Sequence, residues 1–131
     1  TVYDSTLALI QGLKEQDIKV AVISSSKNCL PILQKAKIDS LFDVILTGYD
    51  IPAGRGKPHP DVFLKAAEKL ALTPQTCIVF EDAVLGVEAA KRGGFKCVGI
   101  DRYENPERLA KADIVVSDLS EVTVEQLQKL F

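Results

Sequence analysis

Residues 77–92 read CIVFEDAVLGVEAAKR, in which apolar residues run into two acids and then into a helical pattern. The apolar residues 77–80 predict a buried strand, and the spacing over 84–92 predicts an amphipathic helix. A buried strand followed by such a helix is the repeating unit of parallel α/β sheets. Glu81 and Asp82 would therefore lie at the carboxyl end of a strand, where these sheets bind ligands.

The same alternation extends in both directions along the chain. Helical spacing predicts an N-terminal helix that ends near Gln16, and further helices over 28–37, over 61–72, from Asn105-Pro106, and after Thr123 to Leu130. Apolar runs predict strands at 18–23, 44–47, 96–100 and 114–116. We therefore expect an α/β fold, a Rossmann-like three-layer sandwich with a parallel sheet covered on both faces.

Composition narrows the class of protein and its partners. The 131 residues are 47% hydrophobic and 26% charged with a net charge of −2, which predicts one globular domain over 1–131. No basic stripe favours a nucleic-acid partner, and no apolar run is long enough for a membrane span. Cys77 and Cys97 fall in apolar runs, so we expect buried thiols and a cytoplasmic protein.

A polar cluster follows the apolar residues 20–23; it consists of Ser24, Ser25, Ser26, Lys27 and Asn28. A hydroxyl and backbone N–H groups at the start of a helix bind phosphate. A serine run after a strand is most often a turn or a helix cap. The two interpretations are compatible with each other.

Lys57 lies between Gly56 and Pro58 in the loop 48–60, which holds three Pro and three Gly. Such a loop has an enforced backbone geometry, which would hold the lysine charge in one place. A positioned cation neutralises a phosphoryl group in transfer, although most loop lysines are simply solvated. We therefore treat Lys57 as a candidate catalytic and phosphate-binding residue.

The paired acids Glu81 and Asp82 are candidate metal ligands. Adjacent carboxylates after an apolar strand are costly unless a cation or hydrogen-bond donors satisfy them. Mg²⁺ takes oxygen ligands and is held by one or two carboxylates together with a substrate phosphate. The alternative is that Asp82 caps the helix over 84–92. A hydroxyl, a lysine and two acids together are what magnesium-dependent phosphoryl chemistry requires.

The order of the three clusters resembles that of the haloacid dehalogenase superfamily, more narrowly its β-phosphoglucomutase-like branch. The matching segments are VISSSKN at 22–28, GKPHPDVF at 56–63 and VFEDAVLGVEAA at 79–90. The resemblance implies that Ser24 and Lys57 hold the transferring phosphoryl group and that Glu81 and Asp82 bind Mg²⁺. It also implies that Ser26, Lys27 and Asn28 hold the second phosphate of a sugar bisphosphate, which favours a mutase slightly over a sugar phosphatase.

One family motif has no counterpart in the sequence. The resemblance implies a first strand with Asp-x-Asp, which supplies the nucleophile and the acid/base, followed by a helical cap; the nearest imitation, residues 43–47, has Ile45 in place of the second acid. We therefore expect a C-terminal part of a longer chain, inactive alone, whose intact form transfers phosphoryl groups on phosphosugars through an aspartyl-phosphate. The alternative is an inactive module that binds anions or serves a structural role.

Overall fold

Helices and parallel strands alternate along the chain. The computed structural model describes residues 2–24 and 29–131. Its helices are α1 (Val2–Glu15), α2 (Cys29–Lys35), α3 (Asp61–Lys69), α4 (Val84–Arg92) and α5 (Val124–Gln128). Its strands are β1 (Ala21–Ile23), β2 (Val44–Leu46), β3 (Ile78–Glu81), β4 (Lys96–Ile100) and β5 (Ile114–Val116). Short 3-10 turns lie at Asp39–Leu41 (η1), Pro74–Thr76 (η2), Pro106–Leu109 (η3) and Leu119–Glu121 (η4). The α/β class predicted from the sequence is confirmed.

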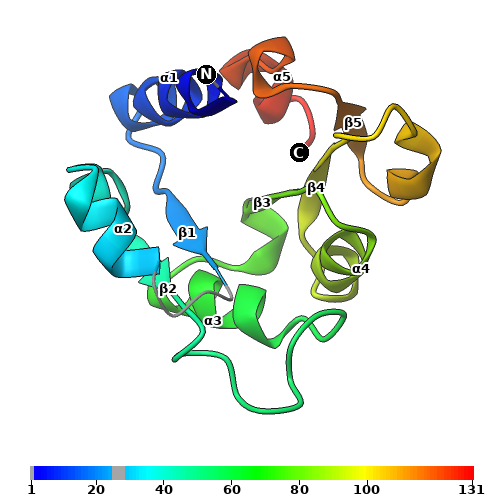
Figure 1. Ribbon diagram of the computed structural model, residues 1–131. Coiled ribbons are helices and arrows are strands. Elements are labelled where there is room, and N and C mark those ends of the chain that lie inside the picture. Colours follow the sequence, from blue (N-terminus) through cyan, green and yellow to red (C-terminus); the bar gives the residue numbers. More distant parts are fainter. Residues whose placement is uncertain (1, 25–28) are drawn as a thin grey trace.

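The strands form two parallel sheets rather than one. β1 pairs with β2, whereas β3, β4 and β5 pair in that order. Within residues 2–24 and 29–131, no ladder joins β1 to β3, and these two strands are the edge strands at which the two sheets face each other (Figure 1). The layer of strands is therefore interrupted between β1 and β3.

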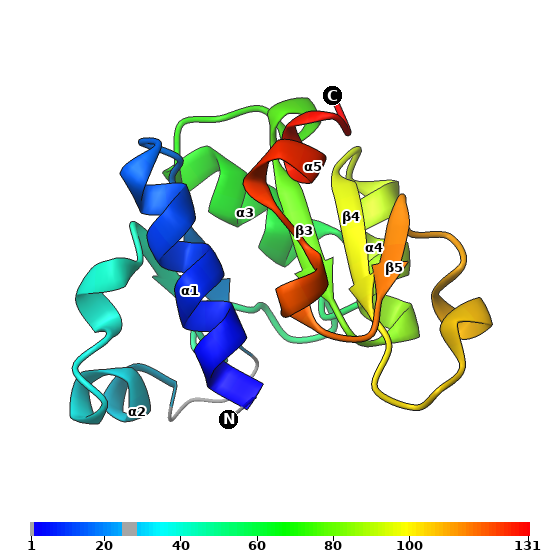
Figure 2. The same ribbon diagram turned by 90° about the horizontal axis from the view of Figure 1, so that it is seen from above.

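Helices cover both faces of the strand layer. α1 and α5 lie on one face, and α3 and α4 lie on the other (Figures 1 and 2). The carboxyl sides of parallel strands point the same way within each sheet, so the loops that follow β3, β4 and β5 share one edge. The observed layers are those of the predicted three-layer sandwich.

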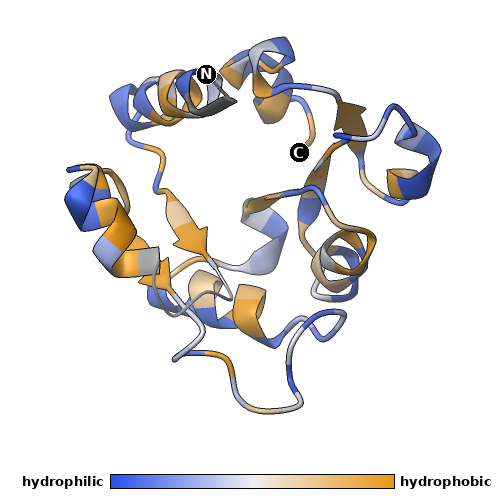
Figure 3. Cartoon of the chain, viewed as in Figure 1, coloured by the Kyte–Doolittle hydropathy of each residue, from blue (hydrophilic) through white to orange (hydrophobic). Residues whose placement is uncertain are grey.

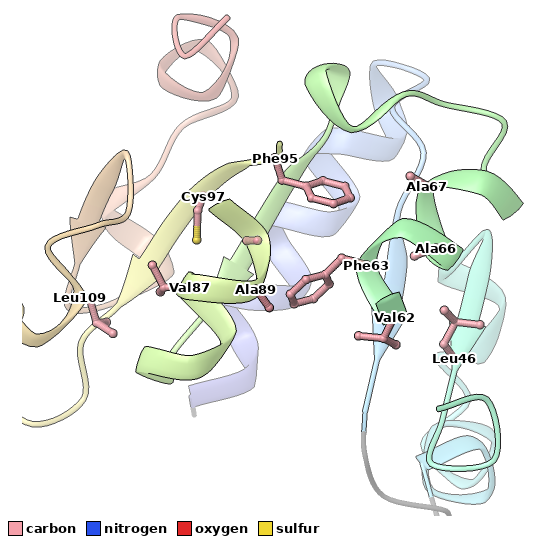
Figure 4. Packing of buried hydrophobic residues seen from close by; sticks show 11 residues of the cluster. Leu46, Val62, Phe63, Ala66, Ala67, Val87, Ala89, Phe95, Cys97 and Leu109 are labelled. Atoms are coloured by element: carbon pink, nitrogen blue, oxygen red, sulfur yellow. The ribbon is translucent and has the colours of Figure 1, made fainter. Parts of the chain in front are cut away.

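The main hydrophobic core lies on the α3–α4 face and spans both sheets. α3 contributes Val62, Phe63, Ala66 and Ala67, which pack with Leu46 of β2 and with Val87, Ala89, Ala90, Phe95, Cys97 and Leu109 (Figure 4). The rings of Phe63 and Phe95 meet edge to face, with centroids 6.0 Å apart. Apolar residues gather on the strands and on the inner sides of the helices (Figure 3). α3 therefore holds the two sheets together across the interruption.

The opposite face has a second, smaller core. Val98, Val122 and Leu127 are buried there, and Ile78, Phe80, Leu9 and Leu13 pack against them. Ile78 and Phe80 thus face α1 and α5, while Cys77 and Val79 face the α3 side. This alternation shows why residues 77–80 are apolar throughout: both faces of the strand are covered.

Helix ends differ from the predicted boundaries by a few residues. Asp17, Lys37 and Ala71 have positive φ angles of 58°, 60° and 59°, and each lies just after a helix. The next residue then donates its N–H back into the helix, as Leu72 does to the oxygen of Ala67 at 2.9 Å. Glycine normally marks this conformation in a sequence, so these three helix ends carried no signal.

The expectation of buried thiols is confirmed for Cys97. Its side chain is fully buried in the main core, and burial raises the pKa of the thiol to about 12. Cys77 is half-buried, and burial likewise raises its pKa. Neither of these two described cysteines forms a disulfide. Among the described helices, none combines the length and the apolar character that crossing a lipid bilayer requires.

Asp43 belongs to residues 43–47, the segment that most resembles the missing Asp-x-Asp motif, and its contacts support the fold. Its carboxylate accepts hydrogen bonds from Lys14 Nζ at 2.8 Å and from the backbone N–H of Val20 at 2.7 Å. The hydrogen bond from Lys14 holds the pKa of the Asp43 carboxyl below its ordinary value of 3.8, and the Val20 hydrogen bond acts in the same direction. Asp43 therefore ties α1 to the start of β1.

We expect Asp43→Asn to lower the free energy of unfolding by about 0.5–1 kcal/mol at neutral pH, because the pair is a third exposed and screened by solvent. The folded state favours the ionised carboxyl, so this contribution is present above the ordinary pKa of 3.8 and is lost as the pH falls through the lower, folded-state value. Denaturant unfolding of both proteins between pH 7 and pH 2 measures it. A constant difference between them over this range would contradict the assignment.

Candidate functional site

Polar residues follow the strands at their carboxyl ends. β1 is followed by Ser24, which is half-buried and donates its backbone N–H to the oxygen of Leu46 at 2.9 Å. β3 ends in Glu81 and is followed by Asp82, and β4 is followed by the buried Asp101. In parallel sheets this edge is where ligands bind.

Lys57 and Glu81 form an ion pair between the loop before α3 and the end of β3. The Glu81 side chain is only 8% exposed, whereas that of Lys57 is 34% exposed. The Lys57 ammonium also lies 5.3 Å from the centroid of the Phe63 ring. Lys57 is therefore held against the core by a buried carboxylate, although about a third of its side chain remains exposed to solvent.

The second oxygen of Glu81 binds the start of α4. Glu81 Oε2 accepts the backbone N–H groups of Asp82 at 2.8 Å and of Ala83 at 3.1 Å. A carboxylate is favoured there because a helix N-terminus presents unpaired N–H groups and the positive end of the helix dipole. Lys57, Asp82 and Ala83 thus account for both oxygens of this buried acid.

Gly86 of α4 makes room for Glu81. A Cβ atom on Gly86 would lie 2.0 Å from Cδ and 2.3 Å from Oε1 of Glu81, which is far inside van der Waals contact. The Glu81 carboxylate therefore rests directly on the backbone of the first turn of α4. The sequence analysis did not single out Gly86, although a glycine inside an otherwise good helix is a usable signal.

Asp82 has a different environment from Glu81. Its side chain is 50% exposed, and one of its oxygens accepts a hydrogen bond from Nε of Arg102 at 3.1 Å. The helix cap is Ala83, which makes no side-chain cap bond, so the alternative that Asp82 caps α4 is wrong. Asp82 is therefore an accessible carboxylate at the strand edge.

The loop after β4 also borders the candidate site, although the sequence pattern did not predict this. Asp101 is buried and accepts the backbone N–H groups of Tyr103 at 3.1 Å and Asn105 at 2.7 Å. Arg108 Nη2 lies 3.5 Å from Asp101 Oδ1, and its guanidinium stacks on the Tyr103 ring at 4.7 Å. The available signal was Asp101 itself, an acid directly after the apolar strand 96–100.

The carboxylates of Glu81 and Asp82 supply some of the oxygen ligands that a hard divalent cation such as Mg²⁺ requires. Asp82 offers accessible oxygen, and Glu81 supplies a second carboxylate next to it that is already hydrogen-bonded. Among the described residues no group of three or more His, Cys, Asp and Glu side chains forms a complete metal cage. Mg²⁺ does not require one, since it keeps several waters and takes phosphate oxygens as ligands. The predicted residues Ser25, Ser26, Lys27 and Asn28 lie outside the described residues.

Comparisons with known proteins show which family the chain resembles. Residues 1–94 match the family model described as haloacid dehalogenase-like hydrolase. The chain is 36% identical over 124 residues to the validoxylamine A 7'-phosphate phosphatase of Streptomyces hygroscopicus subsp. limoneus, covering 91% of this chain and 56% of that protein. It is 36% identical over 121 residues to the β-phosphoglucomutase of Bacillus subtilis, covering 92% of this chain and 51% of that protein.

A solved structure shows the same fold. The crystal structure of β-phosphoglucomutase from Clostridium difficile superposes with a TM-score of 0.85 at 32% identity, over 98% of this chain and 57% of that one. The chain thus spans about half the length of the curated relatives it matches.

Proposed function

The chain belongs to the haloacid dehalogenase-like hydrolase family, and we propose that the protein containing it transfers phosphoryl groups on phosphorylated sugars. The observation that carries the proposal is the pairing of Lys57 with buried Glu81 beside the accessible Asp82. It joins a positioned cation and two acids at one strand edge, as phosphoryl transfer requires.

Each candidate residue has a proposed task. Lys57 places a point charge against the transferring phosphoryl oxygens, and Ser24 donates its hydroxyl to the same group from the end of β1. Ser25, Ser26, Lys27 and Asn28 are proposed to bind phosphate, the last three holding a second phosphate on the substrate. Glu81 positions Lys57, because a buried carboxylate bound to the start of α4 fixes the ammonium.

Asp82, with Glu81 beside it, is proposed to hold Mg²⁺. When bound there, the ion would neutralise charge on the phosphate oxygens. Asp82 suits the task because its carboxylate is exposed and has a displaceable exposed partner. Glu81 suits it less directly, since both of its oxygens already accept hydrogen bonds.

The nucleophile is proposed to come from a strand that precedes this segment in the same polypeptide, which we call the parent protein. In the part of the chain that the structure describes, β1 and β3 each pair on one side only, so a parallel strand between them could form hydrogen bonds with both. Unpaired backbone groups inside a sheet cost about 1–3 kcal/mol each, which favours such an insertion. Its carboxyl end would bring an aspartate nucleophile to the edge that holds Lys57 and Asp82.

The relatives divide between two reactions. Phosphatases and β-phosphoglucomutases both occur among them, and the polar run at 26–28 is the reason we place the mutase slightly first. We propose a cytoplasmic protein, because two of its cysteines, Cys77 and Cys97, are free and form no disulfide. The competing function is an inactive module that retains the anion pocket. It would require a parent protein without the proposed strand.

The test is an assay of the 131-residue chain, alone and mixed with a fragment carrying the proposed strand and cap. We expect magnesium-dependent turnover of β-glucose 1-phosphate or of generic phosphate esters only in the mixture, and its loss on Asp82→Ala. Lys69→Ala, an exposed lysine of α3, serves as the control and keeps the activity. A folded but inactive mixture would reject the proposal in favour of the inactive module, whereas full activity of Asp82→Ala would reject the role proposed for Asp82.

A further inference from the structure

The Arg102–Asp82 ion pair has no role in the proposed reaction, although it occupies the accessible acid of the site. Arg102 Nε donates to Asp82 Oδ2 at 3.1 Å. The two side chains are 46% and 50% exposed. An exposed pair of this kind is weak and readily exchanged, because water and salt screen both charges.

The position of Arg102 is built into the loop after β4. β3 and β4 are paired neighbours with Glu81 opposite Gly99, so the residues that follow both strands emerge side by side. The buried Asp101 then fixes the loop by accepting the N–H groups of Tyr103 and Asn105. Arg102 is therefore tethered within reach of Asp82 by a buried anchor, while its own side chain stays in solvent.

Charges in the site are balanced within the chain. The buried acid, Glu81, has Lys57 as its partner, and the exposed acid, Asp82, has Arg102. The first pair is anchored by burial, whereas the second is open to solvent on both sides. Only the second can therefore separate at little cost when another cation arrives.

We propose that Arg102 is an internal competitor for the divalent cation: its guanidinium neutralises Asp82 in the metal-free protein and opposes binding of the cation at that carboxylate. This inference rests on the proposed function, because it takes Asp82 as a metal ligand. The guanidinium and a divalent cation repel each other when both lie at the same carboxylate, so the tethered charge lowers the affinity of the site. Arg102 is thus a residue that sets metal affinity rather than one that touches the substrate.

Binding of Mn²⁺ to the parent protein tests the proposal without any measurement of activity. The free Mn²⁺ signal in electron paramagnetic resonance gives the dissociation constant, and Mg²⁺ displaces Mn²⁺ in a second titration. We expect Arg102→Gln to bind Mn²⁺ about two- to five-fold more tightly, the gain that removal of an exposed pair provides. Arg102→Lys keeps the charge and should stay close to the unchanged protein.

Arg92→Gln is the matched control, since it removes one positive charge from another exposed pair, with Glu88, and leaves Asp82 untouched. It should shift the affinity less than Arg102→Gln. The difference between Arg102→Gln and the unchanged protein should also shrink as the salt concentration rises.

The possible results distinguish failure of the metal role of Asp82 from failure of the competitor role of Arg102. Asp82→Asn should abolish tight Mn²⁺ binding; if it does not, the proposed metal role of Asp82 fails, and the competitor role fails with it. If Asp82→Asn abolishes binding but Arg102→Gln binds no more tightly than the unchanged protein or than Arg92→Gln, the competitor role alone is overturned.

Discussion

Gly86→Ala is expected to displace Glu81 and to destabilise the protein by about 1–3 kcal/mol, the usual range for forcing extra volume into a packed site. The new Cβ would lie 2.0 Å from Glu81 Cδ, so the side chain of Glu81 must leave its place. It would then lose both the Lys57 pair and the N–H groups of Asp82 and Ala83. Chemical denaturation measures the change, and the proposed phosphoryl transfer should fall with it.

A double-mutant cycle isolates this cause. In a Glu81→Ala background the clash is absent, so Gly86→Ala should change sign and stabilise α4 by about 0.5–1 kcal/mol, as alanine does in place of glycine inside a helix. Gly12→Ala in α1 is the matched control, because its added Cβ would make only an ordinary contact at 3.9 Å with Val124. Destabilisation by Gly86→Ala in both backgrounds would show that the close approach to Glu81 is not the reason.

Hydrophobic pattern and strand-end chemistry made much of the architecture predictable. Residues 77–80 and 97–100 are apolar throughout because helices cover both faces of β3 and β4, and that signal does not depend on distant partners. The adjacent acids after β3 were identifiable for the same reason, since polar residues directly after a buried strand must lie at the carboxyl edge.

Side-chain partnerships could not be predicted. Lys57 and Glu81 are 24 positions apart, and nothing local indicates that the loop before α3 reaches β3. Arg102 reaches Asp82 because β3 and β4 are neighbours and Asp101 anchors the loop after β4. The interruption between β1 and β3 could not be predicted from hydrophobic pattern, because that pattern reports strands and not their order.

Lys57→Met is expected to lower kcat of the proposed phosphoryl transfer by about 10²–10³-fold, which is the typical effect of removing one preorganised charge from a transition state. The reason lies in the position of the ammonium: Glu81 and the Phe63 ring hold it in place before any substrate binds. Lys69→Met, on the exposed face of α3, is the control and should leave kcat unchanged.

Lys57→Met should lower both the stability and the activity, and a second substitution can separate the two effects. Without it the buried Glu81 keeps only the two backbone N–H groups, and we expect a loss of about 1–2 kcal/mol, less than for a fully buried pair because Lys57 is a third exposed. Adding Glu81→Gln removes the unpaired charge and should restore most of that stability while activity stays low. If the double variant regained both, Lys57 would act only by supporting the fold; if only stability returns, and Glu81→Gln alone keeps more activity than the double variant, the charge of Lys57 acts on the phosphoryl group.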